Sequence, residues 1–279
     1  MPELPEVETI KTALNKSLIN KKIKNVNVLQ DKFRIKTQSD FAKRIENSQI
    51  TKIKRRAKYL IIVLDNGYSI INHLGMSGQI KILKEKPSIL DKHDHIIIEC
   101  NDICIIYNDA RRFGLMIYEK TNLLNEHKLF KHLGPEPFCD EYNGQYLFNK
   151  IKNKKSPIKP ALLDQSIIVG IGNIYASELL YDAKISPIRP CNMITLDECN
   201  KIVIESRHVL ERAIKAGGST LKDYKKPDGS LGYFQNAHKV YGKENQLCPI
   251  CKSNINQKHC IKKIIQAGRS SFYCSITQK

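Results

Sequence analysis

The 279-residue sequence contains no apolar run long enough to cross a bilayer, and it contains no internal repeat and no low-complexity tract. Its first ten residues, MPELPEVETI, lack the basic segment and the apolar stretch of a secretory signal. We therefore expect a cytoplasmic protein with no membrane partner. The chain is long enough for two domains that each bury a core of their own.

Acidic residues are scarce relative to basic ones: 28 Asp and Glu stand against 46 Lys and Arg, which gives a net charge of +18. A polyanion releases counterions when it binds such a surface, so nucleic acid is the natural partner. The alternative is a lysine-rich surface that reflects a lysine-rich proteome. Charge alone therefore favours nucleic acid only modestly.

The nine cysteines are odd in number and follow no signal segment, which argues against a disulfide framework. Five are scattered and are expected to act as small apolar side chains: Cys100, Cys104, Cys139, Cys191 and Cys199. The other four lie near the C-terminus: Cys248, Cys251, Cys260 and Cys274. This clustering predicts a metal-stabilised C-terminal module.

Hydrophobic periodicity divides the chain. Residues 5–20 have apolar side chains at helical spacing, and residues 23–118 are mostly strand-like, for example at 58–64, 68–72 and 96–99. Beyond a linker at 134–137, helical patterns occupy 162–163, 174–180 and 196–216, and Gly217-Gly218 then ends the last helix. The tail from residue 240 is too short to form a conventional hydrophobic core, so it needs an additional crosslink, such as a bound metal ion, to be stable.

The N-terminus is a candidate reactive group. Removal of Met1 would leave Pro2 with a secondary amine, and an α-amino group has a pKa of about 7.7–8.0 against about 10.4 for lysine. Such an amine can attack a sugar C1′, and the neighbouring Glu3 or Glu6 can protonate the ring oxygen. The alternative is that Pro2 begins a helix and the glutamates favour its N-terminus. Composition alone favours that alternative.

The string Met1-Pro-Glu-Leu-Pro-Glu-Val-Glu-Thr9 resembles the opening of the formamidopyrimidine-DNA glycosylase family, bacterial base-excision enzymes that remove 8-oxoguanine and ring-opened purines. Further matches follow in order over essentially the full length. They are Arg55–Tyr59, His73–Gly78, Lys92–His95, Asn108–Gly114, His132–Pro137, Ile158–Pro160, Gly170–Glu178, Gly217–Tyr224 and Gly268–Cys274.

The resemblance implies an α+β protein with three parts. These are an N-terminal β-sandwich opened by one helix (1–134), a helix–two-turn–helix DNA-binding domain (135–239) and a C-terminal zinc-finger hairpin (240–279). It implies a bifunctional DNA glycosylase and abasic-site lyase that acts on double-stranded DNA containing oxidised purines or abasic sites. We expect a monomer in the bacterial cytoplasm, associated with the nucleoid.

The resemblance also implies roles for individual residues. Pro2 would displace the damaged base and form a Schiff base, Glu3 would donate a proton, Lys58 would serve β-elimination, and Arg269 would serve δ-elimination and bind phosphate. A lone lysine before a strand is usually a solvated charge, but its motif favours the catalytic role. The residues implied to contact substrate or DNA are Glu6, His73, Met76, His93, Arg111, Phe113, Lys155, Asn173 and Tyr241.

Three of these residues would fill the space left when a base is extruded from the duplex. Met76 and Phe113 would wedge into the stack, and Arg111 would pair with the orphaned cytosine. Alternatively Met76 and Phe113 are core residues, although the adjacent glycines favour exposed turns. Asn173, preceded by Gly170-Ile-Gly172, could equally be a helix cap.

The finger departs from the family pattern, which usually has two Cys-x-x-Cys pairs. Cys248 and Cys251 form the first pair, but Thr277 stands where the partner of Cys274 is expected, and a hydroxyl is a poor zinc ligand. The 22 residues between Cys251 and Cys274 include His259 and Cys260. We favour one structural zinc ion held by Cys248, Cys251, Cys274 and Cys260. A site completed by His259 and a metal-free finger are the alternatives.

Two other functions compete with the glycosylase and lyase acting on oxidised purines. Endonuclease VIII, a near relative, shares the proline mechanism but prefers oxidised pyrimidines; Leu4 and the complete Arg111-Arg-Phe113 motif favour the oxidised-purine branch. A DNA-binding protein that has lost its chemistry is the other alternative. The presence of Pro2, Glu3 and Lys58 argues against it.

Overall fold

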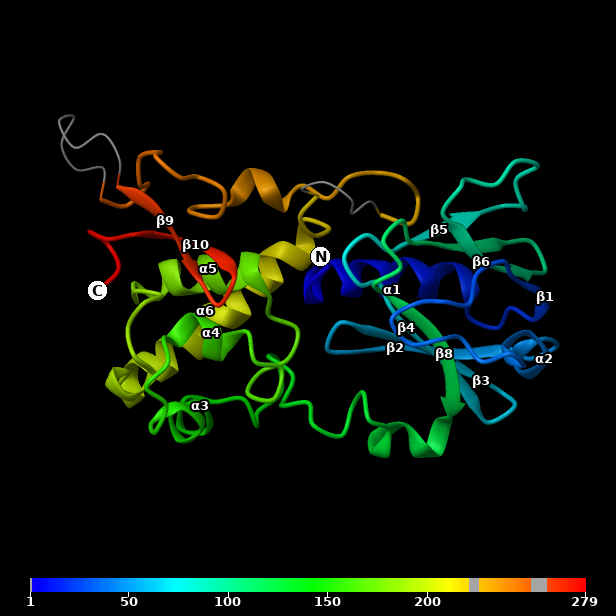
Figure 1. Ribbon diagram of the computed structural model, residues 1–279, viewed down its shortest axis with the longest axis horizontal. Helices are drawn as coiled ribbons and strands as arrows, with labels where there is room; N and C mark the ends of the chain where they lie inside the picture. The colour runs from blue at the N-terminus through cyan, green and yellow to red at the C-terminus, as the bar shows by residue number, and fades with distance from the viewer. Residues whose placement is uncertain (1, 221–225, 252–259) are drawn as a thin grey trace. The chain divides into compact units, whose positions relative to one another are not determined.

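The structure is a computed structural model that describes residues 2–220, 226–251 and 260–279 (Figure 1). Met1, His259 and part of the Gly217–Tyr224 motif therefore lie outside the described residues. The chain forms two compact units, one of Met1–Lys131 with Ile214–Gln235 and one of His132–Ala213 with Asn236–Lys279.

The first unit contains two four-stranded antiparallel sheets, which confirms the expected β-sandwich. One sheet has the order β1-β6-β7-β5, with bounds Ile23–Val28, Asp94–Cys100, Cys104–Asn108 and Gln79–Leu83. The other has the order β2-β3-β4-β8, with bounds Ile50–Arg56, Tyr59–Leu64, Tyr68–His73 and Leu115–Lys120. Helix α1 (Leu4–Leu18) opens the unit as predicted, and the short α2 (Phe41–Ile45) and 3-10 helix η1 (Thr121–Glu126) complete it.

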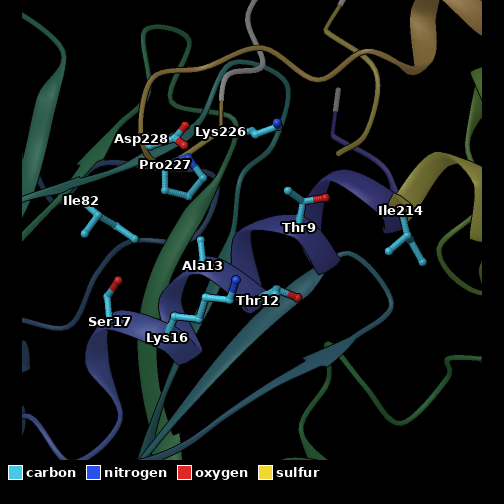
Figure 2. Close-up of a pocket in the computed structure, with 10 residues that line it drawn as sticks. All are labelled: Thr9, Thr12, Ala13, Lys16, Ser17, Ile82, Ile214, Lys226, Pro227 and Asp228. Carbon is cyan, nitrogen blue, oxygen red and sulfur yellow. The ribbon is translucent and has the colours of Figure 1, made fainter. Parts of the chain in front are cut away.

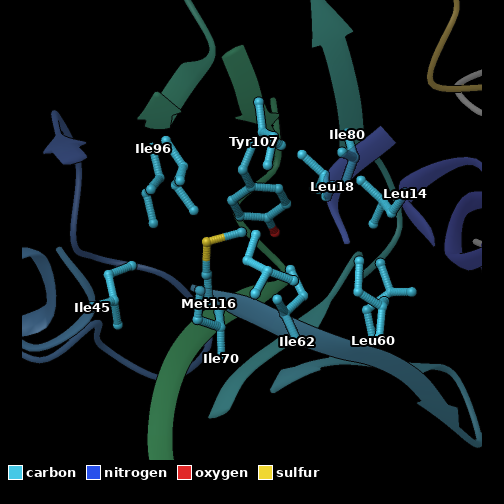
Figure 3. Packing of buried hydrophobic residues seen from close by; sticks show 14 of the residues in the cluster. Leu14, Leu18, Ile45, Leu60, Ile62, Ile70, Ile80, Ile96, Tyr107 and Met116 are labelled. Carbon is cyan, nitrogen blue, oxygen red and sulfur yellow. The ribbon is translucent and has the colours of Figure 1, made fainter. Parts of the chain in front are cut away.

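The core of the first unit forms because α1 and both sheets each present one apolar face. Val7, Ile10, Leu14 and Leu18 recur every three or four residues and are all buried. They belong to one cluster with alternate strand residues, among them Leu60, Ile62, Ile70, Ile96, Tyr107 and Met116 (Figure 3). This packing fixes the start of the chain and the strand ends that carry the candidate site.

The second unit is mainly helical and ends in a hairpin. Its helices are α3 (Gly144–Ile151), α4 (Ile158–Leu162), α5 (Asn173–Asp182) and most of α6 (Leu196–Lys215), with a 3-10 turn, η2 (Cys191–Met193). The η3 turn (Phe234–Ala237) begins in the last two residues of the first unit and ends in the second, and the hairpin strands β9 (Ile261–Gln266) and β10 (Arg269–Cys274) follow. Helix α6 ends where predicted, because Gly217 and Gly218 adopt φ values of +76° and +80° that other residues rarely adopt.

No helix in the described part of the chain is long and apolar enough to span a membrane.

Candidate active site and nucleic-acid interface

The N-terminal candidate residues are buried at the start of α1. Pro2 is buried, and Glu3 and Glu6 are 2% and 1% exposed. The backbone N–H of Glu3 donates to Oε2 of Glu6 at 2.8 Å, as in a capping box. Glu6 thus caps the N-terminus of α1, as expected if the glutamates favour the start of the helix. The carboxyl groups of Glu3 and Glu6 are also close in sequence to the Pro2 nitrogen.

Glu6 also holds the loop that follows α6. Its Oε1 accepts a hydrogen bond from the backbone N–H of Ser219 at 2.7 Å. A Cβ on Gly218 would lie 2.8 Å from the same oxygen, so glycine is needed for this approach. The start of the chain is therefore linked, within the first unit, to Gly218 and Ser219 in the described part of the Gly217–Tyr224 motif.

Lys58 lies in the two-residue turn between β2 and β3 rather than within a strand, and Ala57 takes the positive φ of +54° that the turn requires. Lys58 is only 7% exposed, which is inconsistent with an ordinary solvated lysine. His73 lies opposite Tyr59 in the β3–β4 register, with ring centroids 4.7 Å apart. The sandwich therefore places Lys58 beside the His73–Gly78 motif.

His73 is held in its neutral form. Burial lowers its pKa to about 3, and the positive charges of Arg34 and Lys58 act in the same direction. Its Nδ1 accepts the backbone N–H of Gly75 at 2.9 Å, which shapes the turn that presents Met76. His73 is thus a neutral acceptor that supports a turn.

The turns that carry Met76 and Phe113 are packed directly against each other. Gly75 has φ +62°, and a Cβ there would lie 2.4 Å from the backbone N of Gly114 and C of Phe113. Met76 and Phe113 are 38% and 48% exposed, so the alternative that they are core residues is wrong. The guanidinium of Arg111 lies 4.6 Å from the centre of the Phe113 ring. The three predicted void-filling residues thus stand on adjoining turns.

A buried carboxylate organises these turns. Asp109 has no exposed surface; its Oδ1 accepts the Ser77 hydroxyl at 2.6 Å, and its Oδ2 accepts the Gly114 N–H at 2.9 Å and the Tyr107 hydroxyl at 3.2 Å. Ser77 Oγ in turn accepts the backbone N–H of Arg111 at 3.0 Å. Asp109 therefore connects both turns.

His93 is attached to the same network through its backbone. Its carbonyl accepts the N–H of Asp109 at 3.1 Å, and its half-buried ring lies 6.2 Å from that of His95. His95 Nε2 lies 3.0 Å from the carbonyl oxygen of Asp109. The Lys92–His95 and Asn108–Gly114 motifs are thus adjacent.

In the second unit, Asn173 connects α5 to the C-terminal hairpin. Gly172 is the N-cap of α5, so the helix-cap alternative for Asn173 is wrong. Asn173 Oδ1 accepts from Lys159 Nζ at 2.8 Å, and Nδ2 donates to the Ser270 carbonyl at 2.9 Å. Lys159, only 1% exposed, also donates to the Ser270 carbonyl and to Ser271 Oγ, both at 2.9 Å.

Arg269 follows the tight Ala267-Gly268 turn and begins β10, directly before Ser270, with its side chain exposed. Lys155 is exposed on the segment before α4. Tyr241 is half-buried, with its N–H donating to Glu178 at 2.8 Å and its ring 5.2 Å from Phe272. These residues belong to the second unit, and Pro2, Glu3 and Lys58 belong to the first.

The four C-terminal cysteines converge. One sulfur from each of Cys248, Cys251, Cys260 and Cys274 lies within 4.8 Å of all the others. Sulfurs on a tetrahedral zinc ion are separated by about 3.8 Å, given Zn–S bonds of about 2.3 Å, and the Cys251–Cys274 separation is 3.7 Å. The set therefore fits a metal ion. Of the five scattered cysteines, four are buried and Cys139 is half-buried.

A pocket of about 470 Å³ lies in the first unit between α1, Ile82 and residues 226–228 (Figure 2). Thr9, Thr12, Ala13, Lys16 and Ser17 supply its α1 side. Pro227 lies against β5, since its carbonyl accepts the N–H of Ile82 at 3.1 Å. None of the predicted site residues lines this pocket.

Two family models match most of the chain. Residues 1–116 match the formamidopyrimidine-DNA glycosylase N-terminal domain, and residues 133–225 match the formamidopyrimidine-DNA glycosylase H2TH domain. The chain belongs to the formamidopyrimidine-DNA glycosylase family. The resemblance inferred from the motifs is thereby confirmed.

Relatives and solved structures agree over the whole length. Proteins named formamidopyrimidine-DNA glycosylase are 44% identical in Zymomonas mobilis and 46% identical in the Wolbachia of Culex pipiens, with full coverage of both chains in each case. A Lactococcus lactis Fpg variant in complex with Fapy-dG-containing DNA gives a TM-score of 0.91 at 32% identity, with full coverage of both chains. The Lactococcus lactis Fpg complex with abasic-site DNA gives 0.90 at 32% identity, with 99% of each chain covered.

The structure adds residues to this glycosylase that the motifs alone did not identify. Asp109 lies in the Asn108–Gly114 motif and Ser77 in the His73–Gly78 motif, but they become partners only through the packing of two turns that are distant in sequence. Lys159 stands in the Ile158–Pro160 match, and nothing in its sequence position indicates complete burial. A charged residue inside an apolar helical segment is the signal that could have marked it.

Proposed function

We propose that this glycosylase removes oxidised purines, namely 8-oxoguanine and formamidopyrimidines, from double-stranded DNA and then cleaves the strand at the abasic site. The observation that carries the proposal is the N-terminal segment, where the buried Pro2 precedes two buried carboxyl groups, Glu3 and Glu6. A terminal secondary amine in a protected position is suited to covalent amine catalysis. Family membership and the net charge of +18 support a DNA substrate.

In the first proposed step, the Pro2 nitrogen of the Met1-processed chain uses its lone pair to form a bond to C1′. The glycosidic bond breaks, and its electron pair leaves with the base, which takes up a proton. The nitrogen then loses its proton, Glu3 protonates the ring oxygen, and the C1′–O4′ bond opens to give the iminium. Glu6 positions this segment through its bonds to Glu3 and Ser219.

The strand is then cleaved by two eliminations. Loss of a C2′ proton to water breaks the C3′–O bond, and we assign Lys58 to protonate the departing phosphate. Loss of a further sugar proton breaks the C5′–O bond, and Arg269 binds the second departing phosphate. Support for these roles comes from the low exposure of Lys58 and from the exposed position of Arg269 at the hairpin tip.

The exposed Met76, Phe113 and Arg111 are proposed to fill the space of the extruded base. His93, Lys155, Asn173 and Tyr241 are proposed to contact DNA. Glu6 and His73 are buried, so we assign them to holding the loops at the substrate rather than to phosphate binding.

The cysteine cluster is proposed to hold one structural zinc ion through Cys248, Cys251, Cys260 and Cys274. The ion would crosslink the hairpin that carries Arg269 and would take no part in the chemistry. Metal analysis of purified protein, with Cys260→Ser for comparison, tests the ligand set. Unchanged zinc stoichiometry in that variant would exclude Cys260.

We also propose the division into residues 1–134, 135–239 and 240–279, a monomeric state and a place in the bacterial cytoplasm with the nucleoid. The chain length, the charge and the family support these assignments.

Borohydride reduction on an 8-oxoguanine duplex tests the enzymatic proposal, because it converts the iminium into a stable protein–DNA adduct. We expect the Met1-processed chain to give the adduct. A chain that retains a residue before Pro2 should bind DNA but give none, whereas Pro5→Ala, which leaves the terminal amine unchanged, should still give it. Measurable DNA affinity without an adduct from the processed chain would refute the proposal.

A second substrate class is tested in the same assay. A Lactococcus lactis Fpg structure contains DNA with an oxidised pyrimidine, at a TM-score of 0.90 and 32% identity to this chain. A duplex with an oxidised pyrimidine is therefore included. Adducts on that duplex alone would assign this chain to pyrimidine lesions.

A further inference from the structure

Two hydroxyl groups converge on one sulfur of the cysteine cluster. The Tyr181 hydroxyl lies 3.0 Å from Cys248 Sγ, and the Thr277 hydroxyl lies 3.3 Å from the same atom. Tyr181 comes from α5 and has no exposed surface, and Thr277 is half-buried just after β10. Two elements far apart in sequence therefore meet at Cys248.

The direction of both hydrogen bonds follows from the chemistry of a metal-bound cysteine. A metal-ligating cysteine is a thiolate, which has no proton to donate. Each hydroxyl must then be the donor and Cys248 Sγ the acceptor. Sulfur is a weak acceptor in a thiol, but as a thiolate it accepts charge-assisted hydrogen bonds.

Two backbone amides also contact sulfurs of the cluster. The backbone nitrogen of Thr277 lies 3.4 Å from Cys274 Sγ, and that of Cys248 lies 2.8 Å from Cys260 Sγ. Thr277 thus keeps both a backbone and a side-chain contact with the cluster, although its position is that of a cysteine in the family pattern. Cys260, from the longer loop, brings a fourth sulfur within 4.8 Å of the other three.

We propose that Thr277 and Tyr181 are outer-shell donors that stabilise the Cys248 thiolate, so that the former ligand position at 277 tunes the metal site instead of binding the ion. The inference rests on the proposed four-cysteine site. Four thiolates around a divalent cation carry a net charge of −2 in a largely buried setting, and donors to sulfur disperse that charge. Outer-shell partners of this kind typically contribute about 10–100-fold to metal affinity.

The experiment measures metal affinity of the full chain rather than activity. Thr277→Val removes the hydroxyl at nearly constant volume, Thr277→Ser retains it, and Tyr181→Phe removes the second donor. Zinc affinity is measured by competition with a chelator, and cobalt(II) absorption reports how many thiolates bind the metal. Tyr142→Phe is the matched control, because Tyr142 is equally buried in the same unit but its hydroxyl lies 3.4 Å from Ser206.

We expect Thr277→Val and Tyr181→Phe each to weaken zinc binding by about 10–100-fold. Thr277→Ser and Tyr142→Phe should remain within about twofold of the unmodified chain. At saturating cobalt, Thr277→Val should keep the full thiolate charge-transfer intensity, whereas Cys260→Ser should lose about a quarter of it if four thiolates bind.

Three results would overturn the inference, and they are distinguishable. Unchanged zinc affinity in both Thr277→Val and Tyr181→Phe would refute the outer-shell role while leaving the four-cysteine site intact. If Cys260→Ser leaves the saturated cobalt spectrum unchanged while Thr277→Val alters it, Thr277 is itself a ligand. No thiolate–cobalt absorption from the unmodified chain would refute the metal site and the inference together. Thermal unfolding with and without zinc identifies any variant that has lost its fold.

Discussion

Replacing Lys159 with methionine should weaken the second unit and disturb a DNA contact that Lys159 does not itself make. Methionine has a similar length but no donors, so it removes the bonds to Asn173 Oδ1, the Ser270 carbonyl and Ser271 Oγ. The Ser270 carbonyl keeps the bond from Asn173 Nδ2, but Asn173 Oδ1 loses a charged donor.

The magnitude follows from these contacts. A hydrogen bond to a charged group contributes about 1.5–3 kcal/mol, and a buried acceptor left without its donor costs about 1–3 kcal/mol. Removing a buried ammonium recovers part of its desolvation cost. We therefore expect Lys159→Met to lower the free energy of unfolding by about 3 kcal/mol. Affinity for abasic-site DNA should fall as well, because the Asn173 side chain loses the bond at Oδ1 and keeps the bond from Nδ2 to the Ser270 carbonyl.

Urea unfolding and a DNA-binding titration at several salt concentrations measure both effects. Lys155→Met is the matched control, because Lys155 is exposed on the segment before α4. It should change the free energy of unfolding by less than about 0.5 kcal/mol while reducing the salt dependence of DNA binding. A Lys159→Met chain as stable as Lys155→Met would refute the proposed role of the buried network.

Three further predictions concern the first unit. Asp109→Ala removes the acceptor shared by Ser77, Gly114 and Tyr107, so the free energy of unfolding should fall by about 3 kcal/mol in urea titrations; a loss below about 0.5 kcal/mol would contradict the network. The pKa of His73 is about 3 in the folded chain and about 6.5 when the chain is unfolded. The free energy of unfolding should therefore fall by up to about 1.4 kcal/mol per pH unit as the pH drops from about 6 to 4. His73→Gln should make this pH dependence less steep. Phe113→Ala shortens an exposed side chain, so the free energy of unfolding should change by less than about 0.5 kcal/mol. Affinity for DNA that contains a lesion should fall, because the wedge is lost. An equal loss of affinity for undamaged duplex would contradict the wedge role.

The regular elements could be predicted because their signals are local. The spacing of Val7, Ile10, Leu14 and Leu18 predicts α1. Strand-like apolar patterns predict the strands of the first unit, and the Gly217-Gly218 pair predicts the end of α6. Exposure of Met76 and Phe113 could also be predicted, because the adjacent glycines permit the close approach of two turns.

The supporting network could not be predicted from local signals. Asp109 and Lys159 acquire their roles only when segments far apart in sequence meet, Lys159 with residues more than a hundred positions away. The bonds of the Asn173 side chain to Lys159 and Ser270 could not be predicted either, for the same reason. Its helix-cap alternative is wrong because Gly172 is the N-cap of α5. The motifs therefore identify candidate reactive groups, while the tertiary structure identifies what holds them.

The central claim is that the Pro2 nitrogen forms the covalent bond to DNA, and mapping the borohydride-trapped adduct by mass spectrometry tests it most directly. Tryptic digestion of the Met1-processed chain gives an N-terminal peptide that ends at Lys11. We expect the reduced sugar fragment to be attached to this peptide at Pro2. Attachment at Lys58, or at any other lysine, would contradict it.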